Sequence, residues 1–313
     1  MPRTRIPDDV LSLAHERAAA RVARDWAEAD RLRGEIEAAG WKVVDRGTDF
    51  ALEPARPPTI EDEGTVRYGA SLDVPARFDE RPVGTATVVV VATDWPDDLA
   101  RTLAALDRDA PDGVSVVVVA DGPSPDQDAA LPPDGSGAEV VRTSQRLGTA
   151  AAWNIGIRRA AAPIVIVLDT SVEPTGDVVT PLVRALEDAT VGVAGGFGLV
   201  SADLRTFEDA PPGDVTAVGG YAIAFRRSDA ATRGPLDERF RFYRNLDVWW
   251  SLVLRDEGEE SAPRRAVAIE IPAVRREHRG WTSVSEAERD RLSKRNFYRI
   301  IDRFGHRRDL ASD

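Results

Sequence analysis

The stretch from Pro163 to Pro174 constrains the fold of this chain more than any other. Residues 164–168 read Ile-Val-Ile-Val-Leu, five consecutive apolar residues of which four are β-branched. An apolar run without alternation is typical of a strand buried on both faces of a parallel sheet. The run ends at Asp169, and open α/β sheets bind ligands at the carboxyl ends of their strands. An aspartate that only caps the following turn would leave the same pattern, so both interpretations stand at this point.

Strands and helices alternate on both sides of this run. Further apolar segments predict strands of the same sheet at 87–92, 114–120 and 138–142, with later strands at 191–194, 215–219 and 221–225. Helical patterns separate the earlier segments, and this βαβα order predicts a parallel sheet with right-handed crossovers. The later strands make the predicted sheet mixed. The fold class is therefore α/β.

Composition excludes several classes of site and partner. The chain has 313 residues and a formal net charge of −12, which disfavours general attraction to nucleic acid or anionic lipid. It has no cysteine and only three scattered histidines, so no thiolate or zinc site is expected. No apolar run has the length of a transmembrane helix, and the N-terminus lacks a signal-peptide pattern. A cytoplasmic location is predicted.

The N-terminal part reads as a separate module. Residues 8–39 predict two helices, the second with an apolar stripe of Trp26, Ala29, Leu32 and Ile36 that ends at the helix-terminating Gly40. A β-hairpin is predicted around residues 45–49. The expected organisation is a helical hairpin with a β-hairpin over 1–53, a proline-rich linker over 54–84 and a large domain over 85–313.

This module resembles the C-terminal end of bacterial cysteinyl-tRNA synthetases. The residues that carry the resemblance are Glu16–Arg21, Arg24–Trp26, Ala29–Arg33, Glu35-Ile36 and Ala39–Asp45. In that family the module ends a tRNA-binding region. Acidic and basic residues are nearly balanced here, so we expect a packing or interaction role rather than RNA binding.

Two further features of the large domain suggest a ligand site. Asp121 ends its predicted strand as Asp169 does, and two strand-end carboxylates in one sheet indicate one crevice. An aspartate that forms a turn with Gly122 would explain Asp121 equally well. Residues 148–156 then open a helix with small residues on several faces, a pattern that suits either a bound ligand or tight helix–sheet packing. Asn154 in this helix needs hydrogen-bond partners if it is buried.

The order of these motifs resembles that of family 2 glycosyltransferases of the GT-A fold, over roughly residues 85–300. The matching stretches are Val88–Thr93, Val117–Ser124, Arg146–Gly148, Asn154–Gly156, Ile166–Pro174, Ala224–Arg227, Gly234–Phe240 and Phe242–Asp247. The resemblance implies a Rossmann-like mixed sheet flanked by helices. It also implies a nucleotide-sugar site that contains Thr93, Asp121, Gly148, Asn154 and Asp169.

The same resemblance implies a divalent metal, Mg²⁺ or Mn²⁺. Asp169 takes the place of the family's Asp-x-Asp motif, whose carboxylates hold the cation against the diphosphate of the donor. Ser171 stands where the second carboxylate is expected, which weakens the metal prediction. His278 lies where members of the family often carry a histidine near the metal, and it is the second candidate ligand. Arg276, Arg279 and Arg295 are candidate partners of the diphosphate.

Asp247 matches the aspartate that acts as general base in the resembled family. An inverting displacement needs a base that takes the acceptor's proton as its oxygen attacks the anomeric carbon. Leu246 replaces the glutamate expected before it. Trp249 and Trp250 follow, and their indole rings suit either a sugar or lipid acceptor or the protein core.

The sequence therefore predicts an inverting glycosyltransferase that moves a sugar from a nucleotide-diphosphate sugar to an unidentified glycan, lipid or protein acceptor. The alternative is a catalytically impaired binding or scaffold protein, because carboxylates are missing at Ser171 and Leu246. Residues 286–304 predict an amphipathic helix with an apolar stripe of Leu292, Phe297, Ile300 and Ile301. Its mixed charges favour docking on the domain, with a peripheral membrane location left open.

Overall fold

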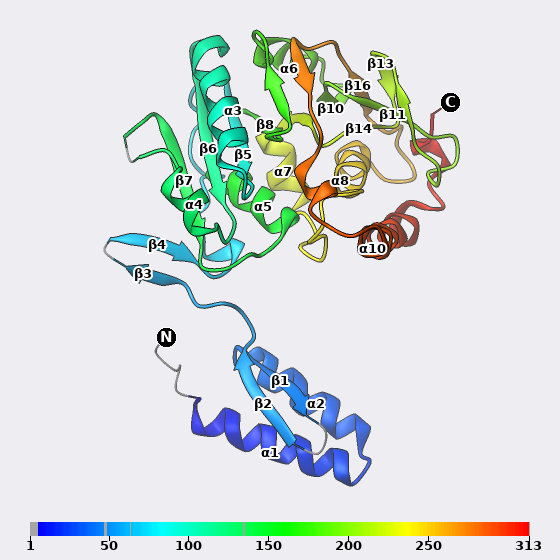
Figure 1. Cartoon of the computed structure of the whole chain (residues 1–313). Helices are drawn as coiled ribbons and strands as arrows, with labels where there is room; N and C mark the ends of the chain where they lie inside the picture. The colour runs from blue at the N-terminus through cyan, green and yellow to red at the C-terminus, as the bar shows by residue number, and fades with distance from the viewer. Residues whose placement is uncertain (1–5, 47–48, 63, 134, 313) are drawn as a thin grey trace. The chain divides into compact units, whose positions relative to one another are not determined.

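The computed structural model describes residues 6–46, 49–62, 64–133 and 135–312. The chain divides into two compact units, Met1–Ile60 and Glu61–Asp313. Each unit has its own hydrophobic core. Figure 1 shows the helices and strands of both.

Unit 1 contains two helices and a two-stranded antiparallel sheet. Its elements are α1 (Asp8–Val22), α2 (Trp26–Ala38), β1 (Trp41–Arg46) and β2 (Asp49–Pro54). Val10, Ala14, Ile36 and Trp41 form its buried core. Gly40 has a φ of +81°, so it ends α2 in the left-handed conformation that the sequence predicted. The central residues of the predicted hairpin turn, 47 and 48, lie outside the described residues.

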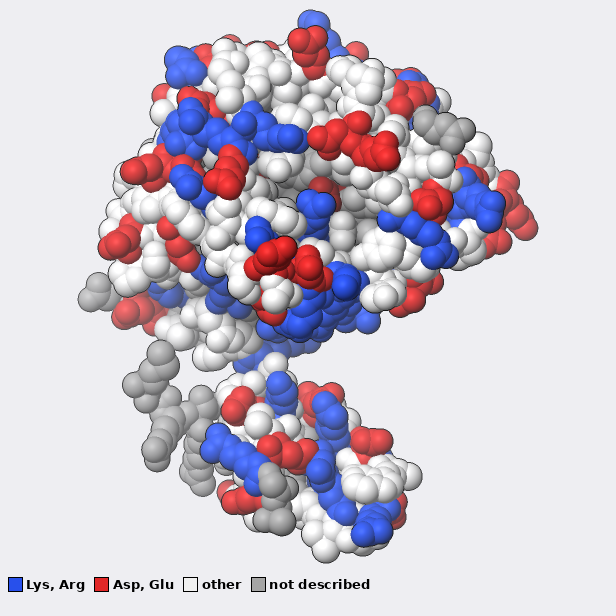
Figure 2. Space-filling model, turned by 45° about the vertical axis from the view of Figure 1, so that its right-hand side comes forward, with Lys and Arg blue, Asp and Glu red and all other residues white. Residues whose placement is uncertain are grey.

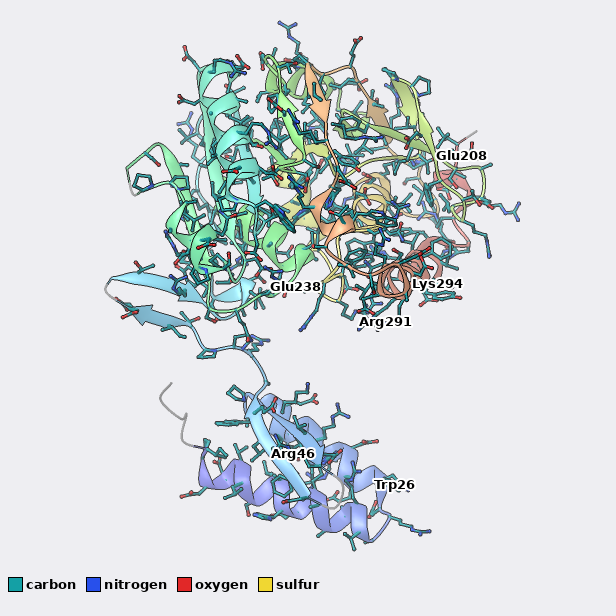
Figure 3. The ribbon with its side chains drawn as sticks, in the orientation of Figure 1. Trp26, Arg46, Glu208, Glu238, Arg291 and Lys294 are labelled. Atoms are coloured by element: carbon teal, nitrogen blue, oxygen red, sulfur yellow. The ribbon has the colours of Figure 1, made fainter. Side chains whose placement is uncertain are left out.

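Trp26 differs from its predicted place in the apolar stripe of α2. Ala29, Leu32 and Ile36 are buried, but Trp26 is 59% exposed. It is the first residue of α2, beyond the part of the helix that packs on the core, and its side chain is labelled in Figure 3. The stripe is correct from Ala29 onward.

Unit 2 is built on one mixed sheet. In the described part of the chain this sheet has the order β13-β16-β10-β15-β8-β5-β6-β7-β4-β3. Its strands are β3 (Ile60–Asp62), β4 (Thr65–Tyr68), β5 (Ala86–Ala92), β6 (Val114–Ala120), β7 (Ala138–Thr143), β8 (Ile164–Leu168), β10 (Val191–Gly195), β13 (Gly213–Val215), β15 (Ala222–Arg226) and β16 (Arg265–Ala268). The neighbours β4, β7, β6, β5 and β8 are parallel, whereas β15 is antiparallel to β8 and to β10. The predicted α/β class and the mixed sheet are therefore confirmed.

Helices cover both faces of this sheet (Figure 1). Their bounds are α3 (Pro96–Asp109), α4 (Pro125–Ala129), α5 (Thr149–Arg159), α6 (Val179–Ala185), α7 (Arg227–Arg233), α8 (Leu246–Arg255), α9 (Arg279–Thr282) and α10 (Glu286–Phe304). The sheet face that contains Val165 and Val167 packs against α5 and α8, and the face that contains Ile166 packs against α3 and α6. All five residues of β8 are buried, as its unbroken apolar sequence predicted.

Smaller elements complete unit 2. They are β9 (Val172–Pro174), β11 (Gly198–Val200), β12 (Glu208–Ala210), β14 (Ala217–Val218), β17 (Ala273–Arg275) and the 3₁₀ turns η1 (Ser71–Asp73) and η2 (Arg308–Leu310). β9 pairs with β17, which brings residues 273–276 beside the end of β8. Among the described residues, no helix is both long enough and apolar enough to cross a bilayer.

The predicted linker over 54–84 is largely part of unit 2. β4 adds to the sheet as a parallel neighbour of β7. Val74 is 1% exposed, and the Val83 N–H donates to the carbonyl of Ala161 over 3.0 Å. The apolar periodicity of the sequence does not reveal this order, because strand pairing and hydrogen bonds to the backbone contribute to holding the segment.

Candidate active site

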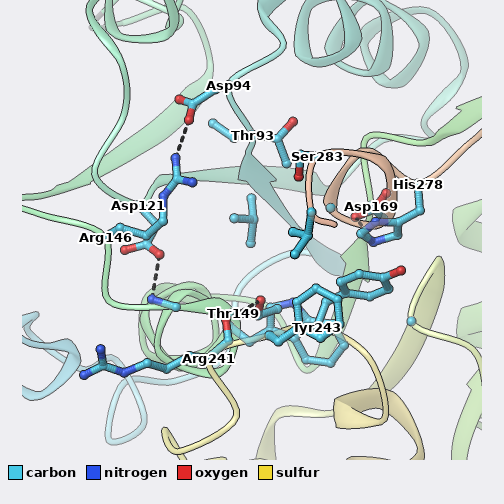
Figure 4. A pocket seen from close by; sticks show the side chains of 18 of the residues that line it. Thr93, Asp94, Asp121, Arg146, Thr149, Asp169, Arg241, Tyr243, His278 and Ser283 are labelled. Carbon is cyan, nitrogen blue, oxygen red and sulfur yellow. Dashed lines mark hydrogen bonds and ion pairs between the residues drawn. The ribbon is translucent and has the colours of Figure 1, made fainter. Parts of the chain in front are cut away.

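A cavity of about 250 Å³ opens at the carboxyl ends of β5, β6 and β8 (Figure 4). These strands are parallel neighbours, so the residues that follow them meet at one edge of the sheet. Six of the seven residues predicted for the site line this cavity: Thr93, Asp121, Gly148, Asp169, Asp247 and His278. Asp94, Asp121 and Arg146 lie at one end in Figure 4, and Asp169, His278 and Tyr243 at the other.

Asp121 is held by backbone groups at the first end. Its Oδ1 accepts from the Leu147 N–H at 2.7 Å and its Oδ2 from the Gly148 N–H at 2.8 Å. Burial raises the pKa of Asp121, and these hydrogen bonds only partly offset that effect. The carboxylate therefore fixes the loop that enters α5.

Asp94 and Arg146 form an ion pair beside Asp121 that the sequence analysis did not identify (Figure 4). The other oxygen of Asp94 accepts from the Ser124 N–H at 3.0 Å. Arg146 is 64% exposed in its side chain, so it covers the cavity from the solvent side. Arg146 belongs to the matching stretch Arg146–Gly148, but the two residues are 52 positions apart, so no local pattern indicates that they pair.

Gly148 has to be glycine. Its φ is +109°, a conformation that side chains rarely adopt, and a Cβ there would lie 2.8 Å from the Cα of Arg241. This close approach lets the N–H groups of Thr149 and Ala150 donate to the carbonyls of Arg241 and Phe240. The loop between α7 and α8 is thereby attached to the start of α5, and its residues Arg241 and Phe242 line the cavity.

Asp169 and His278 meet at the second end. Asp169 Oδ1 accepts from the Ser171 N–H at 2.8 Å and from the Ser171 hydroxyl, and Asp169 Oδ2 lies 3.3 Å from His278 Nε2. The His278 ring stacks on Tyr243 with centroids 3.6 Å apart. Burial acts to raise the pKa of Asp169, but hydrogen bonding and charge from His278, with the bonds from Ser171, outweigh it and lower that pKa.

These residues fit a divalent cation held jointly with a substrate. A carboxylate oxygen and an imidazole nitrogen face each other, a pair that suits Mn²⁺ with phosphate oxygens and water, whereas Mg²⁺ would use mainly the carboxylate. Among the described residues, no group of three or more His, Asp and Glu side chains could hold a metal by itself. His278 Nδ1 is buried and has no hydrogen-bond partner among the described residues, so stacking on Tyr243 rather than a second acceptor orients the ring.

Asp247 lies in the first turn of α8, with its carboxylate at the cavity wall. Its Oδ2 accepts from the Gly220 N–H at 2.8 Å and its Oδ1 from the Val248 N–H at 2.9 Å. Burial raises the pKa of Asp247, and these N–H groups with the charge of Arg244 only partly offset that effect. A carboxylate with a raised pKa at a cavity wall is suited to accept a proton.

The loop before Asp247 is anchored by α10. Asn296 is buried and its amide donates to the carbonyls of Phe242 at 2.9 Å and of Arg244 at 2.8 Å. Ile300 and Phe304 of α10 are buried in the core of unit 2. The structure therefore contains the predicted helix over 286–304, and this helix docks on the domain as predicted. The docked helix holds the loop that leads into α8.

Replacing Asn296 with alanine is expected to destabilise unit 2 by about 1–3 kcal/mol, because two buried carbonyls lose their donor. Chemical denaturation of the full chain measures this loss. Arg295→Ala, at an exposed position of the same helix, is the control and should change the free energy of unfolding by less than about 0.5 kcal/mol. Equal effects of the two variants would contradict the anchoring role.

Asn154 does not line the cavity, and neither do the candidate diphosphate partners Arg276, Arg279 and Arg295. The amide of Asn154 donates to Leu236 O at 3.0 Å and to Glu238 Oε1 at 2.9 Å, and its Oδ1 accepts from the Leu236 N–H at 2.8 Å. The prediction that it binds the nucleotide sugar is corrected: it ties α5 to the loop before Phe240. Gly156, two residues on, permits tight helix–sheet packing, since a Cβ there would lie 2.1 Å from a methyl of Val89.

Other residues considered from the sequence also pack or pair. Trp249 is 6% and Trp250 0% exposed, and Trp250 meets Phe225 edge-on in the core. The core interpretation of both is therefore correct. Arg276 pairs with Glu173, and Arg279 with Asp98 at 2.8 Å.

Comparison with known proteins agrees with this geometry. Residues 87–235 match the sequence model of Glycosyl transferase family 2. This part of the chain is a family 2 glycosyltransferase domain. The match includes β5, β6 and β8 and therefore the strand-end residues Thr93, Asp121 and Asp169. The prediction of a glycosyltransferase is confirmed at the level of the family.

Two solved structures share the fold of the glycosyltransferase domain. A crystal structure of GalNAc-T7 with UDP, GalNAc and Mn²⁺ matches with a TM-score of 0.56 and 16% identity, over 71% of this chain and 48% of that one. The mannosyltransferase PcManGT from Pyrobaculum calidifontis, solved with GDP-Man and Mn²⁺, matches with a TM-score of 0.50 and 19% identity, over 72% of this chain and 69% of that one. The predicted GT-A fold is confirmed.

Unit 1 is similar to a short part of cysteine–tRNA ligases. It is 49% identical over 55 residues to the ligase of Opitutus terrae, and 54% identical over 48 residues to that of Chlamydia muridarum. The matched part is 18% of this chain and only 12% of the Opitutus protein. The predicted resemblance of the N-terminal segment is confirmed for this segment alone.

Proposed function

We propose that the glycosyltransferase domain transfers a sugar from a nucleotide-diphosphate sugar to an acceptor hydroxyl with inversion at the anomeric carbon. The observation that carries the proposal is the placement of Asp121, Asp169 and Asp247 on the wall of one cavity, at the strand ends and the start of α8. Solved structures of the same fold contain UDP or GDP-Man, which supports a nucleotide donor.

The residues suggest a division of the cavity. The end with Thr93, Asp121 and Arg146 would take the base and ribose, since carboxylate and hydroxyl oxygens accept from these groups and guanidinium planes stack on bases. The diphosphate would lie toward Asp169 and His278, the residues that would hold a divalent cation. When bound, that cation neutralises the charge that develops on the departing diphosphate.

Asp247 would act as the base. It accepts the proton of the acceptor hydroxyl while the hydroxyl oxygen forms a bond to the anomeric carbon. The bond from that carbon to the diphosphate breaks on the opposite face, and the nucleoside diphosphate leaves with the electron pair. Gly220 and Val248 hold the carboxylate through their N–H groups, so Asp247 needs no rearrangement to face the cavity.

A screen of nucleoside diphosphates and nucleotide sugars tests the proposal. We expect UDP, GDP or dTDP to raise the melting temperature of the full chain with Mn²⁺ present, and the matching nucleotide sugar to be turned over. Binding without turnover of any donor would favour the alternative, a catalytically impaired binding protein. The absence of carboxylates at Ser171 and Leu246 is the observation that supports this alternative. No stabilisation by any nucleotide at millimolar concentration would reject both.

For unit 1 we propose a packing or interaction role rather than RNA binding. Several of its described arginines are engaged by carboxylates: Asp45 pairs with Arg17 at 2.9 Å and with Arg21 at 2.6 Å, and Arg31 pairs with Glu28 at 2.6 Å. Paired guanidinium groups release few counterions from a phosphate backbone.

Filter binding of bulk tRNA to the full chain is therefore expected to show no saturable retention at physiological salt. The physical reason is the near neutrality of the paired arginines in unit 1. Saturable retention that weakens steeply as salt rises would contradict the packing role.

A further inference from the structure

A second cavity of about 310 Å³ lies beside the first. Tyr221, Tyr243 and His278 line both, so these three side chains form the boundary between the two cavities. The remaining lining is rich in arginine: Arg244, Arg275 and Arg276, with Glu277 as the acidic member. The second cavity adjoins the Asp169–His278 end of the first and does not share Asp94, Asp121 or Arg146 with it.

Two of these arginines lie against aromatic rings rather than in strong ion pairs. Arg244 lies over the ring of Trp281 at 5.0 Å, and no hydrogen bond or ion pair of its side chain is found among the described residues. Arg275 lies over Tyr221 at 5.0 Å, and its contact with Asp209 is 3.9 Å long to a carboxylate that is 78% exposed. A guanidinium held by its face keeps its N–H edge available for an oxyanion.

Arg276 is different, because it is neutralised by Glu173. The positive charge of the second cavity therefore comes from Arg244 and Arg275, and Glu277 offsets part of it. The protein as a whole carries a net charge of −12, and Figure 2 shows acidic and basic side chains interspersed around the hollow in unit 2. Two weakly paired arginines in a hollow of such a protein focus a local positive potential.

Arg244 also lies close to the chemistry. It immediately precedes Asn245, the residue that caps α8, and Asp247 is in the first turn of that helix. The charge of Arg244 acts to lower the pKa of Asp247 and of both boundary tyrosines, although burial outweighs it in each case. A group bound at Arg244 is thus within electrostatic reach of the proposed base.

We propose that the second cavity binds the acceptor through an anionic group, a phosphate or a carboxylate, held by Arg244 and Arg275 so that a neighbouring hydroxyl reaches Asp247. This inference rests on the proposed function and names its acceptor class. The diphosphate of the donor has the same oxyanion chemistry, so the experiment has to separate the two sources.

Calorimetric titration with inorganic phosphate tests the site on the full chain saturated with UDP. We expect phosphate to bind while UDP stays bound, and the affinity to fall about tenfold or more in the double variant Arg244→Gln, Arg275→Gln. Arg244→Lys, which keeps the charge but not the planar fork, should be intermediate. Arg108→Gln is the control, since Arg108 is exposed on α3 and pairs with Asp109.

Each other outcome overturns the inference. Phosphate that binds equally well to the double variant, or not at all, removes the site. Displacement of phosphate by UDP, with UDP binding weakened in the double variant, assigns the arginines to the donor. If GDP or dTDP binds in place of UDP, it replaces UDP in this experiment. Failure of all three to bind the wild-type chain rejects the proposed function instead, and phosphate titration without a nucleotide then reports on the arginines alone.

Turnover tests the acceptor class with the donor that the nucleotide-sugar screen identifies. Glucose 6-phosphate and glucuronate are expected to stimulate release of nucleoside diphosphate at least tenfold more than glucose, and the double variant to lose this preference. Equal stimulation by the neutral and anionic sugars would overturn the proposal even if phosphate binds.

Discussion

Asp247→Asn is expected to lower kcat for sugar transfer by about 10²–10⁴-fold, the range that a positioned general base contributes. The amide has the size of the carboxylate and an oxygen that keeps one of the bonds from Gly220 and Val248, but it accepts no proton. Steady-state kinetics with the identified donor measures the loss. The affinity for nucleoside diphosphate should stay within about twofold, because the first end of the cavity is unchanged.

The control for this variant is Asp214→Asn. Asp214 is 62% exposed, pairs with Arg265 and lies outside the cavity. Its kcat should equal that of the wild type. If Asp247→Asn retained more than about a tenth of the wild-type kcat with its melting temperature unchanged, Asp247 would not be the base.

The pH profile of kcat/KM provides an independent expectation for Asp247. Transfer needs the ionised carboxylate, so activity is present above the pKa of Asp247 and is lost as pH falls through it. Burial raises this pKa, so the acid limb should lie above the value of about 3.9 for an ordinary aspartate. An acid limb at or below that value would contradict the assignment.

The sheet was predictable because each of its central strands has a local signal. Ile164–Leu168 is apolar throughout, Val114–Ala120 is apolar except at Ser115, and both strands have the predicted bounds. Burial on both faces needs this pattern and no knowledge of the partner strand. The C-terminal helix was predictable for the same reason, because its sequence signals are local. Ser285, for example, caps the start of the helix by accepting from the Glu288 N–H.

The site was only partly predictable, because several of its contacts join residues far apart in the chain. Asn154 has its partners at Leu236 and Glu238, and its sequence position in a helix of small residues fitted a ligand contact equally well. Tyr243 was not predicted to orient His278, because nothing local relates the two rings that stack in the structure. Strand β4 was not predicted, because it lies in a segment that composition assigned to a linker.

A cation site with one metal-binding aspartate explains the arrangement around Asp169 better than the loss of the metal site does. Ser171 donates its backbone N–H and its hydroxyl to Asp169 Oδ1, so the residue that replaces the second carboxylate orients the first. Asp169 Oδ2 is left facing His278. A pair of one carboxylate and one imidazole supplies less negative charge than two carboxylates, which predicts weaker binding of cation without substrate and a stronger dependence on the diphosphate.

Asp169→Asn is therefore expected to abolish the Mn²⁺-dependent part of the stabilisation by nucleoside diphosphate. It is also expected to lower kcat/KM by about 10²-fold or more, because a metal at a phosphoryl oxygen contributes several kcal/mol. Melting temperatures with UDP or GDP, in Mn²⁺ and in EDTA, measure the first effect without turnover. His278→Ala should reduce the same difference. A full Mn²⁺ effect in Asp169→Asn would rule out Asp169 as a ligand.

Asp94→Asn is the matched control for that experiment, because Asp94 lines the same cavity at the opposite end. It should keep the Mn²⁺ effect and lose only contacts around Arg146. The comparison also separates metal binding from the fold of the loop after β8. Asp169→Asn weakens the hydrogen bonds from Ser171, so the melting temperature of this variant without ligand is expected to fall. The change caused by Mn²⁺ is measured within each variant and therefore does not depend on this loss of stability.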